Sequence, residues 1–263
     1  MSIRRTWICW RMAARDLVRR RIVLLLILLI PMLFFTLTVL TTRTTVVLFK
    51  LAAAPREPVV WVSERREALV FIGMAAAALI ASFLGLNLTQ RHIDGTRRLV
   101  LCGLRSTEVS TAKGFLLLCV ATAIGLWVSG LLACLFQPRH LAGVWAGFVL
   151  TGFIYGAYGM LAGGLLKHEM EGILFVVLLV NIDAGWLQNP IFYAEAQNRA
   201  IIRYLPAFYP SQVAMMSAFS NHAVAVPLLK GTLYGLFLLA CAYGILHRKL
   251  KTYRKPGPET GKS

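Results

Sequence analysis

Six long apolar runs occupy most of this 263-residue sequence and constrain its fold more than any other feature. A helix needs roughly 20 apolar residues to cross a hydrocarbon core of about 30 Å. Runs of about this length lie at residues 22–40, 68–89, 114–136, 141–166, 172–187 and 227–246. The sequence therefore predicts six transmembrane helices, of which the fifth is short.

The composition leaves little room for a soluble domain. Apolar residues make up 58% of the chain and charged residues 15%, whereas soluble domains typically have about 45–50% and 25%. We therefore expect residues 1–263 to form a single transmembrane domain without a nucleotide-binding domain of its own. The net charge of +17 would suit nucleic acid, but basic residues that flank apolar runs more often reflect membrane topology, so no nucleic-acid partner is expected.

The positions of the basic residues predict the orientation. If both termini are cytoplasmic, 19 of the 28 Lys and Arg residues lie in cytoplasmic segments, which are residues 1–21, 90–113, 167–171 and 247–263. This positive-inside bias favours an even number of spans in the cell membrane and a basic cytoplasmic tail at 247–263. The first outer loop, at about 43–67, holds five basic residues, but three glutamates lie among them.

The first 21 residues have the pattern of an amphipathic helix. Trp7 and Trp10 share one face with Ile3, Ala14 and Leu17, and the opposite face carries Arg4, Arg11, Arg15 and Arg19. This pattern predicts an interfacial helix with its tryptophans at headgroup level and its arginines toward anionic lipid. The alternative is a simple cluster of charges that orients the first span. The first apolar run is too long for a signal-peptide core, so we expect it to be retained.

Neither a metal site nor a nucleotide site is expected in this chain. The five cysteines are odd in number and lack metal-ligand spacing, and His168-Glu169 lacks the second histidine of a zinc motif. The ending GPETGKS is close to a phosphate-binding loop, but its spacing is one residue short and no helix can follow it.

The stretch from Gln90 to Lys113 is the most informative part of the sequence. Asp94 and Thr96 flank Gly95 and are candidate N-caps for a short helix that continues through a Leu-rich turn and ends at Gly103. Ser106 is a second N-cap candidate, followed by Glu108 in the first turn of the next helix. The pattern predicts a helical hairpin with a short helix at its cytoplasmic tip.

This loop resembles that of the permeases of the ABC-2 family of ATP-binding cassette exporters, which typically reads ER-x-x-GT-LxxLLxxPxS followed by Lys. The matching residues are Gly95, Thr96, Leu99, Leu101, Ser106 and Lys113. Arg91 and Leu104 depart from the pattern, because an acidic residue and a proline are common there. The resemblance implies a coupling helix that docks on a separate ATPase subunit, through Arg91, Asp94, Gly95, Thr96, Arg97, Arg98, Leu99, Leu101 and Arg105.

The resemblance extends over the whole chain. The amphipathic start resembles the connecting helix of the family, and residues 203–219, broken by Pro206 and Pro210, resemble its segment between spans five and six. It implies a transport subunit that is not itself an enzyme, with ATP and Mg bound by the partner ATPase and no cofactor on this chain. It also implies a second permease, identical or a sister chain, besides the surrounding membrane lipids.

The outer segment from about Gln188 to Val226 holds the candidates for an outer gate. After Ser211 as an N-cap, a short apolar helix is expected, and the resemblance implies re-entrant helices at a substrate exit, with Tyr209 and Met215 as candidate gate residues. The alternative is an external loop anchored by aromatic residues. Asp183, with Asn181 nearby, is the acidic residue within a predicted span, and it is a candidate either for the pathway or for a structural polar contact.

The predicted fold is an all-α membrane protein with six transmembrane helices, an amphipathic N-terminal helix, a coupling helix between spans two and three, and re-entrant outer helices between spans five and six. Glycines at three- and four-residue spacing in the fourth run favour close helix packing over a flexible pathway. The expected function is export of an amphipathic drug, peptide or lipid-like substrate. The alternatives are an intramembrane lipid- or peptide-processing enzyme and a non-transporting immunity or scaffold subunit.

Overall fold

A computed structural model describes residues 3–51, 59–90, 104–189, 192–193 and 196–252. The structure is about 83% helical and contains six helices that are long and apolar enough to span a membrane. They are α2 (Arg21–Thr41), α3 (Glu64–Gln90), α5 (Ser106–Leu135), α6 (Leu141–Leu165), α7 (Glu169–Ile182) with its π-helical continuation η1 (Asp183–Leu187), and α11 (Ala225–Thr252). Each predicted apolar run coincides with one of these helices, although α5 begins eight residues before its run and α11 ends six residues after its run. The chain has the architecture of a multi-pass membrane protein.

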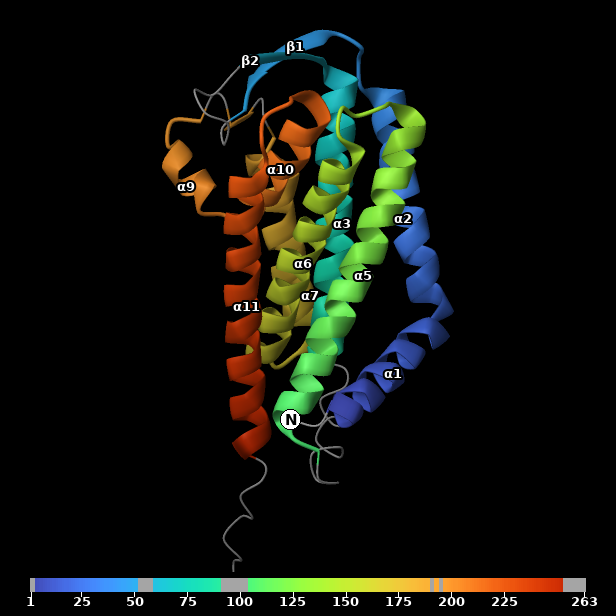
Figure 1. Ribbon diagram of the computed structural model, residues 1–263, viewed down its shortest axis with the longest axis vertical. Helices are drawn as coiled ribbons and strands as arrows, with labels where there is room; N and C mark the ends of the chain where they lie inside the picture. Colours follow the sequence, from blue (N-terminus) through green and yellow to red (C-terminus); the bar gives the residue numbers. More distant parts are fainter. Residues whose placement is uncertain (1–2, 52–58, 91–103, 190–191, 194–195, 253–263) are drawn as a thin grey trace, which may run out of the picture.

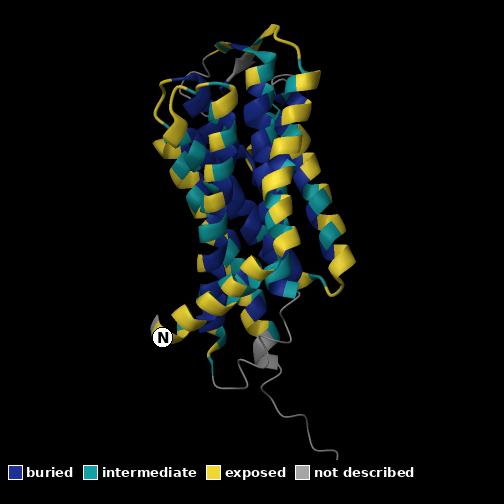
Figure 2. Cartoon of the chain, turned by 90° about the vertical axis from the view of Figure 1, so that its right-hand side faces the viewer, coloured by how far each residue is buried: buried dark blue, intermediate teal, exposed yellow. Residues whose placement is uncertain are grey.

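The six long helices form one elongated bundle (Figure 1). Helices α3 and α6 are the most buried of the six, whereas α2, α7 and α11 expose most of their apolar side chains. Figure 2 shows this arrangement as a buried interior surrounded by exposed outer faces. An apolar outer surface is what a bundle in lipid requires, because lipid chains solvate such side chains as readily as a protein core does.

Glycines allow α3 and α6 to approach each other closely. A Cβ atom added to Gly85 would lie 2.0 Å from the carbonyl oxygen of Gly156, and one added to Gly159 would lie 2.0 Å from that of Ser82. Real Cβ atoms do not come so near to backbone atoms, so side chains at these positions would force the helices apart. The glycines of this span therefore serve the packing of the bundle.

The chain is not entirely α-helical, which corrects the predicted fold class. Strands β1 (Val46–Lys50) and β2 (Val59–Ser63) form an antiparallel hairpin in which Val46 pairs with Ser63. It lies across one end of the bundle, which we call the hairpin end (Figure 1). Val46, Val47 and the run Val59–Val62 are β-branched or aromatic, which favours strands. That signal was available in the sequence of the first outer loop.

Two shorter helices lie at the hairpin end, between α7 and α11. These are α9 (Arg199–Arg203) and α10 (Phe208–Phe219). Ten of the twelve residues of α10 are buried, so α10 is inserted among the long helices. A short apolar helix was predicted here with Ser211 as its N-cap. The helix instead begins at Phe208, and Pro210 and Ser211 lie within its first turn, where a proline is tolerated.

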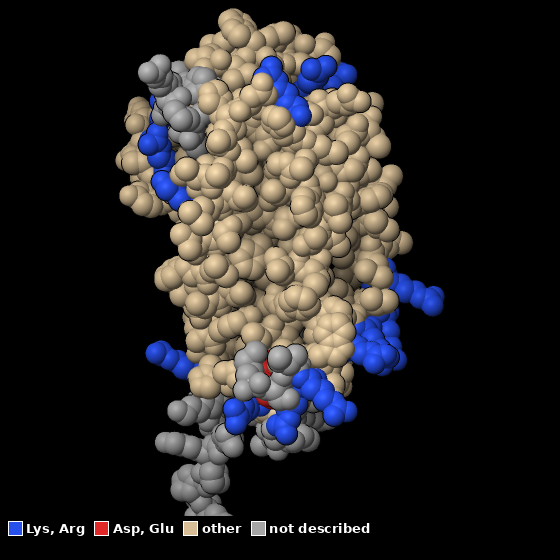
Figure 3. Space-filling model, in the orientation of Figure 1, with Lys and Arg blue, Asp and Glu red and all other residues tan. Residues whose placement is uncertain are grey.

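Helix α1 (Ile3–Arg19) runs obliquely at the opposite end of the bundle, which we call the α1 end (Figure 1). The described Lys and Arg side chains gather at the two ends, and Figure 3 shows a wide uncharged band between them. This distribution is typical of a protein whose middle part lies in the hydrocarbon core.

Candidate functional site

The predicted coupling helix lies outside the described residues. Eight of its nine candidate residues fall there: Arg91, Asp94, Gly95, Thr96, Arg97, Arg98, Leu99 and Leu101. Arg105, the ninth, is exposed at the start of α5. The two flanks of the loop are described, and they show how its ends are attached to the bundle.

The first flank is fastened by Gln90, the last residue of α3. Its side-chain amide Nε2 donates to the carbonyl oxygens of Leu166 (3.4 Å) and His168 (3.3 Å). These carbonyls belong to the turn that joins α6 to α7, because α6 ends at Leu165 and α7 begins at Glu169. Gln90 thus links the beginning of the loop to the α6–α7 turn. The sequence held no signal for this contact, since its partners lie more than 75 residues away.

The second flank is organised by the start of α5. The backbone N–H of Arg105 donates to the Glu108 carboxylate at 3.2 Å, so Glu108 stabilises the first turn as the sequence predicted. Ser106 is not the N-cap, because the helix begins at Ser106 and Arg105 takes the cap position. The Ser106 hydroxyl instead lies 2.6 Å from Nδ1 of His247 in α11. This end of the loop is therefore tied to the last transmembrane helix.

Helix α1 packs on the same part of α5. The buried side chain of Cys9 contacts Val109 and Ala112, and Trp10 and Leu104 pack around this cluster. Burial, and secondly the negative charge of Glu108, raise the pKa of the Cys9 thiol above its ordinary value. Leu104 of the loop, the start of α5 and helix α1 therefore pack together in one small apolar cluster.

The two tryptophans of α1 differ in how far they are buried against the bundle. Their rings stack with centroids 4.5 Å apart, and the Trp10 ring lies 5.8 Å from that of Phe115 in α5. Trp10 is half-buried, whereas Trp7 is 54% exposed. Arg11 and Arg15 are exposed on the outer face, as the amphipathic pattern requires.

At the hairpin end, Asp183 forms the centre of a buried polar cluster. Its side chain is 1% exposed. Oδ2 accepts hydrogen bonds from the Tyr155 hydroxyl of α6 and from the backbone N–H of Ala207 (2.9 Å), and Oδ1 accepts one from Nε2 of Gln188 (3.0 Å). Three donors compensate the desolvation of the carboxyl group. Asp183 therefore connects α6, the π-helical turn and the segment before α10.

Gln188 and Ser211 extend this cluster into α10. Nε2 of Gln188 also lies 3.4 Å from the carbonyl oxygen of Ile202, and the Ser211 hydroxyl lies 3.4 Å from Oε1 of Gln188. Ser211 donates more closely to the carbonyl oxygen of Phe208, at 2.6 Å, within the first turn of α10. Side chains of the segment after α7 and of α10 therefore contact each other directly.

The other predicted residues of the outer gate lie apart from this cluster. Asn181 is exposed, and its amide donates to the carbonyl oxygen of Val177 in its own helix. Tyr209 is half-buried beside Phe208, and Met215 is 2% exposed in the main apolar core. The structure thus separates Asp183 from Asn181 and gives it two side-chain partners, Tyr155 and Gln188, which sequence reasoning missed. Ser211, predicted as an N-cap, contacts Gln188 instead.

The end of α10 is held by the turn between α5 and α6. The backbone N–H groups of Arg139 and His140 donate to the carbonyl oxygens of Ala218 (3.1 Å) and Ser217 (2.9 Å). The rings of Phe136 and Phe219 stack beside them at 6.0 Å. Helix α10 is therefore fixed at both ends, by Asp183 and Gln188 before it and by this turn after it.

Across the ranges that the structure describes, no three His, Cys, Asp or Glu side chains are grouped so that they could hold a metal ion. No protein-family model matches the chain, and no curated protein matches it in sequence.

Proposed function

We propose that this chain is the membrane permease subunit of an ABC exporter and works with a separate ATPase subunit. The proposal rests on the loop motif of residues 90–113 and is supported above all by the attachment of that loop. Gln90 fastens one end to the α6–α7 turn, while Leu104 and Ser106 join the other end to α1 and α11. A loop attached in this way can transmit a movement of a protein bound outside the membrane to several helices at once.

The proposed mechanism is alternating access in a pair of permeases, identical or sister chains, on two ATPases. ATP binding brings the ATPases together and moves the two coupling helices. Through Gln90 the movement reaches the base of α7, whose far end carries Asp183 and its contacts with α10. Breaking these contacts would open the hairpin end and release an amphipathic substrate there. Such coupling requires an element with two states that both sites bias, and α10 with its polar anchors is our candidate.

The test is reconstitution of the chain with its presumed partner, a separate ATPase subunit that carries Walker motifs. We expect the two chains to co-purify, and we expect Gly95→Pro and Arg98→Glu to uncouple ATP hydrolysis from transport while the complex still assembles in the membrane. Lys230→Glu, at an exposed lysine near the start of α11 at the opposite end of the bundle, is the matched control and should leave coupling intact. Normal coupling in both loop variants would refute the assigned role of the loop, and failure of any ATPase to bind would refute the proposed function.

A further inference from the structure

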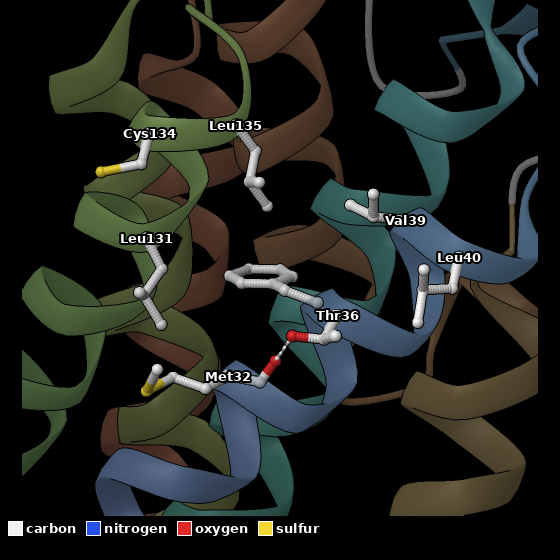
Figure 4. A pocket seen from close by; sticks show the side chains of 8 residues that line it. Met32, Thr36, Val39, Leu40, Leu131, Cys134 and Leu135 are labelled. Carbon is white, nitrogen blue, oxygen red and sulfur yellow. Dashed lines mark hydrogen bonds between the residues drawn. The ribbon is translucent and has the colours of Figure 1, made fainter.

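An apolar groove runs between α2 and α5 near the hairpin end (Figure 4). Its volume is about 260 Å³, and its walls are Met32, Phe35, Thr36, Val39 and Leu40 of α2 with Leu131, Cys134 and Leu135 of α5. The one hydroxyl in this lining, that of Thr36, donates to the carbonyl oxygen of Met32 at 2.8 Å. Apart from the weakly polar thiol of Cys134, the side chains that line the groove offer no free polar group, so the groove suits a hydrocarbon chain.

Helix α3 closes the bottom of this groove. The Phe35 side chain is 3% exposed and points inward to α3, where a Cβ atom on Gly73 would lie 3.1 Å from Cζ of its ring. Met32, Leu40 and Leu135, by contrast, are at least 45% exposed. The groove is thus closed toward the protein and open toward the lipid-facing side.

Two arginines from the first turn of α3 lie at the outer end of the groove. Arg65 Nη2 donates to the carbonyl oxygen of Thr42, just beyond the α2 wall, at 3.2 Å. The Arg66 guanidinium lies 6.0 Å from the ring centre of Phe136, just beyond the α5 wall. Arg65 is partly exposed and Arg66 is exposed. The accessible N–H groups of the two guanidinium groups are suited to a phosphate oxygen.

Acidic side chains at the same turn offset this charge only in part. Glu64 accepts a hydrogen bond from the Thr45 hydroxyl at 2.8 Å and keeps its negative charge, whereas Glu67 is 2% exposed and directed into the protein. Arg43, which is exposed one residue beyond Thr42, adds a third cation. The mouth of the groove is therefore basic on its outer surface.

We propose that this groove is a specific site for one membrane glycerophospholipid. An acyl chain lies between α2 and α5, and the phosphodiester binds Arg65 and Arg66. A helix of a second copy would fill the groove but would leave the arginine donors without an anion, so the combination of apolar groove and basic mouth favours a phospholipid. The site does not depend on the proposed transport activity.

The site can be tested by photolabelling of the full chain in vesicles. The probes are phosphatidylethanolamine and phosphatidylglycerol that carry a diazirine in one acyl chain, and a diacylglycerol with the same acyl chain but no phosphate. We expect both phospholipids to label peptides of α2 and α5 that line the groove, and the diacylglycerol to label them much less. Labelling by one phospholipid alone would identify the headgroup; equal labelling by the diacylglycerol would overturn the phosphate contact and with it the proposal.

Two variants and a control separate the acyl and headgroup contacts. Cys134→Trp fills the groove from an exposed position and should abolish the labelling. Arg66→Gln should weaken phospholipid retention in native mass spectrometry by about tenfold, the usual effect of losing one charge-assisted hydrogen bond. Leu233→Trp, at a 58% exposed position of α11, should change neither. Unchanged labelling in Cys134→Trp, or cross-linking of Cys134 between two copies by a short bifunctional reagent, would show that no lipid occupies the groove.

Discussion

The hydroxyl of Tyr155 in α6 donates a hydrogen bond to the carboxylate of Asp183 in η1, and both side chains are almost completely buried. The same carboxylate oxygen accepts the backbone N–H of Ala207. One oxygen atom therefore connects a central transmembrane helix to the segment that leads into α10. Tyr155 and Asp183 are 28 residues apart in the sequence, so this contact forms only when the bundle is assembled.

Replacement of Asp183 by leucine should destabilise the protein strongly. The change leaves the Tyr155 hydroxyl and the Ala207 N–H without their acceptor and the Gln188 amide with only its long contact to the Ile202 carbonyl oxygen. Each unsatisfied buried donor costs about 1–3 kcal/mol. We expect a large fall in the thermal unfolding temperature in detergent. Asn181→Leu is the matched control, because the Asn181 amide is exposed and bonds only within its own turn. Equal stability of the two variants would contradict the structural role of Asp183.

Replacement of Gly159 by alanine should disrupt the contact between α3 and α6. The added methyl group would lie 2.0 Å from the Ser82 carbonyl oxygen, and relief of such overpacking typically costs about 1–3 kcal/mol. Gly130→Ala in α5 is the control, since a Cβ added there would meet, within the described residues, no atom of another segment within 4 Å. Thermal unfolding should separate the two variants, with Gly130→Ala equal to or slightly above the unchanged protein. Comparable melting temperatures would mean that the two helices are less closely packed than described.

Replacement of Gln90 by leucine should weaken coupling to the ATPase more than it weakens folding. The substitution removes both hydrogen bonds to the α6–α7 turn, which are long and contribute little to stability. In the reconstituted complex we expect ATP hydrolysis to become less dependent on substrate. Asn87→Leu, which loses a bond within α3 only, should keep that dependence. A loss of dependence in Asn87→Leu as well would assign the effect to α3 as a whole.

The reaction of Cys9 with a maleimide should be slow at neutral pH. Only the thiolate reacts, and the raised pKa of Cys9 lowers the thiolate fraction at every pH below it. The rate should therefore continue to rise with pH beyond the point at which an ordinary thiol is fully ionised. The same chain unfolded in SDS gives the reference rate.

A charge variant separates electrostatics from access in this reaction. Glu108→Gln removes the negative charge that helps to raise the pKa of Cys9, so it should increase the rate at a fixed pH. Glu169→Gln, at the start of α7 on the same end of the bundle, is the control. If both variants reacted like the unchanged protein, access alone would limit the reaction.

The six spans were predictable because their signal is local. Each needs only a continuous apolar stretch of sufficient length, and the observed bounds differ from the predicted ones mainly where polar ends extend the helix, as at Glu64–Glu67 of α3 and Ser106–Lys113 of α5. The amphipathic helix α1 was predictable for the same reason. Its packing partner was not, because Cys9 and Val109 lie 100 residues apart.

The polar contacts show the limits of such prediction most clearly. Asp183 was recognisable as a candidate, since an acid in a span is rare. Its partners were not recognisable, because a tyrosine, a glutamine and a backbone N–H in three separate segments carry no common pattern. The prediction of Ser106 as an N-cap was wrong, although serine is favoured at that position. Arg105 takes the cap position because its backbone N–H bonds to Glu108, and the helix therefore begins one residue earlier than predicted.

The close approach of α3 and α6 has a consequence for how this molecule can move. With carbonyl groups of one helix lying against glycines of the other, neither can slide or rotate without backbone atoms colliding. The two helices must then travel as one rigid body through any working cycle. If the chain works as proposed, opening occurs at the borders of this pair with the helices around it, α2, α5, α7, α10 and α11. A ligand that wedges into one of those borders would then arrest the protein, whereas one bound along the α3–α6 contact would find no moving part to block.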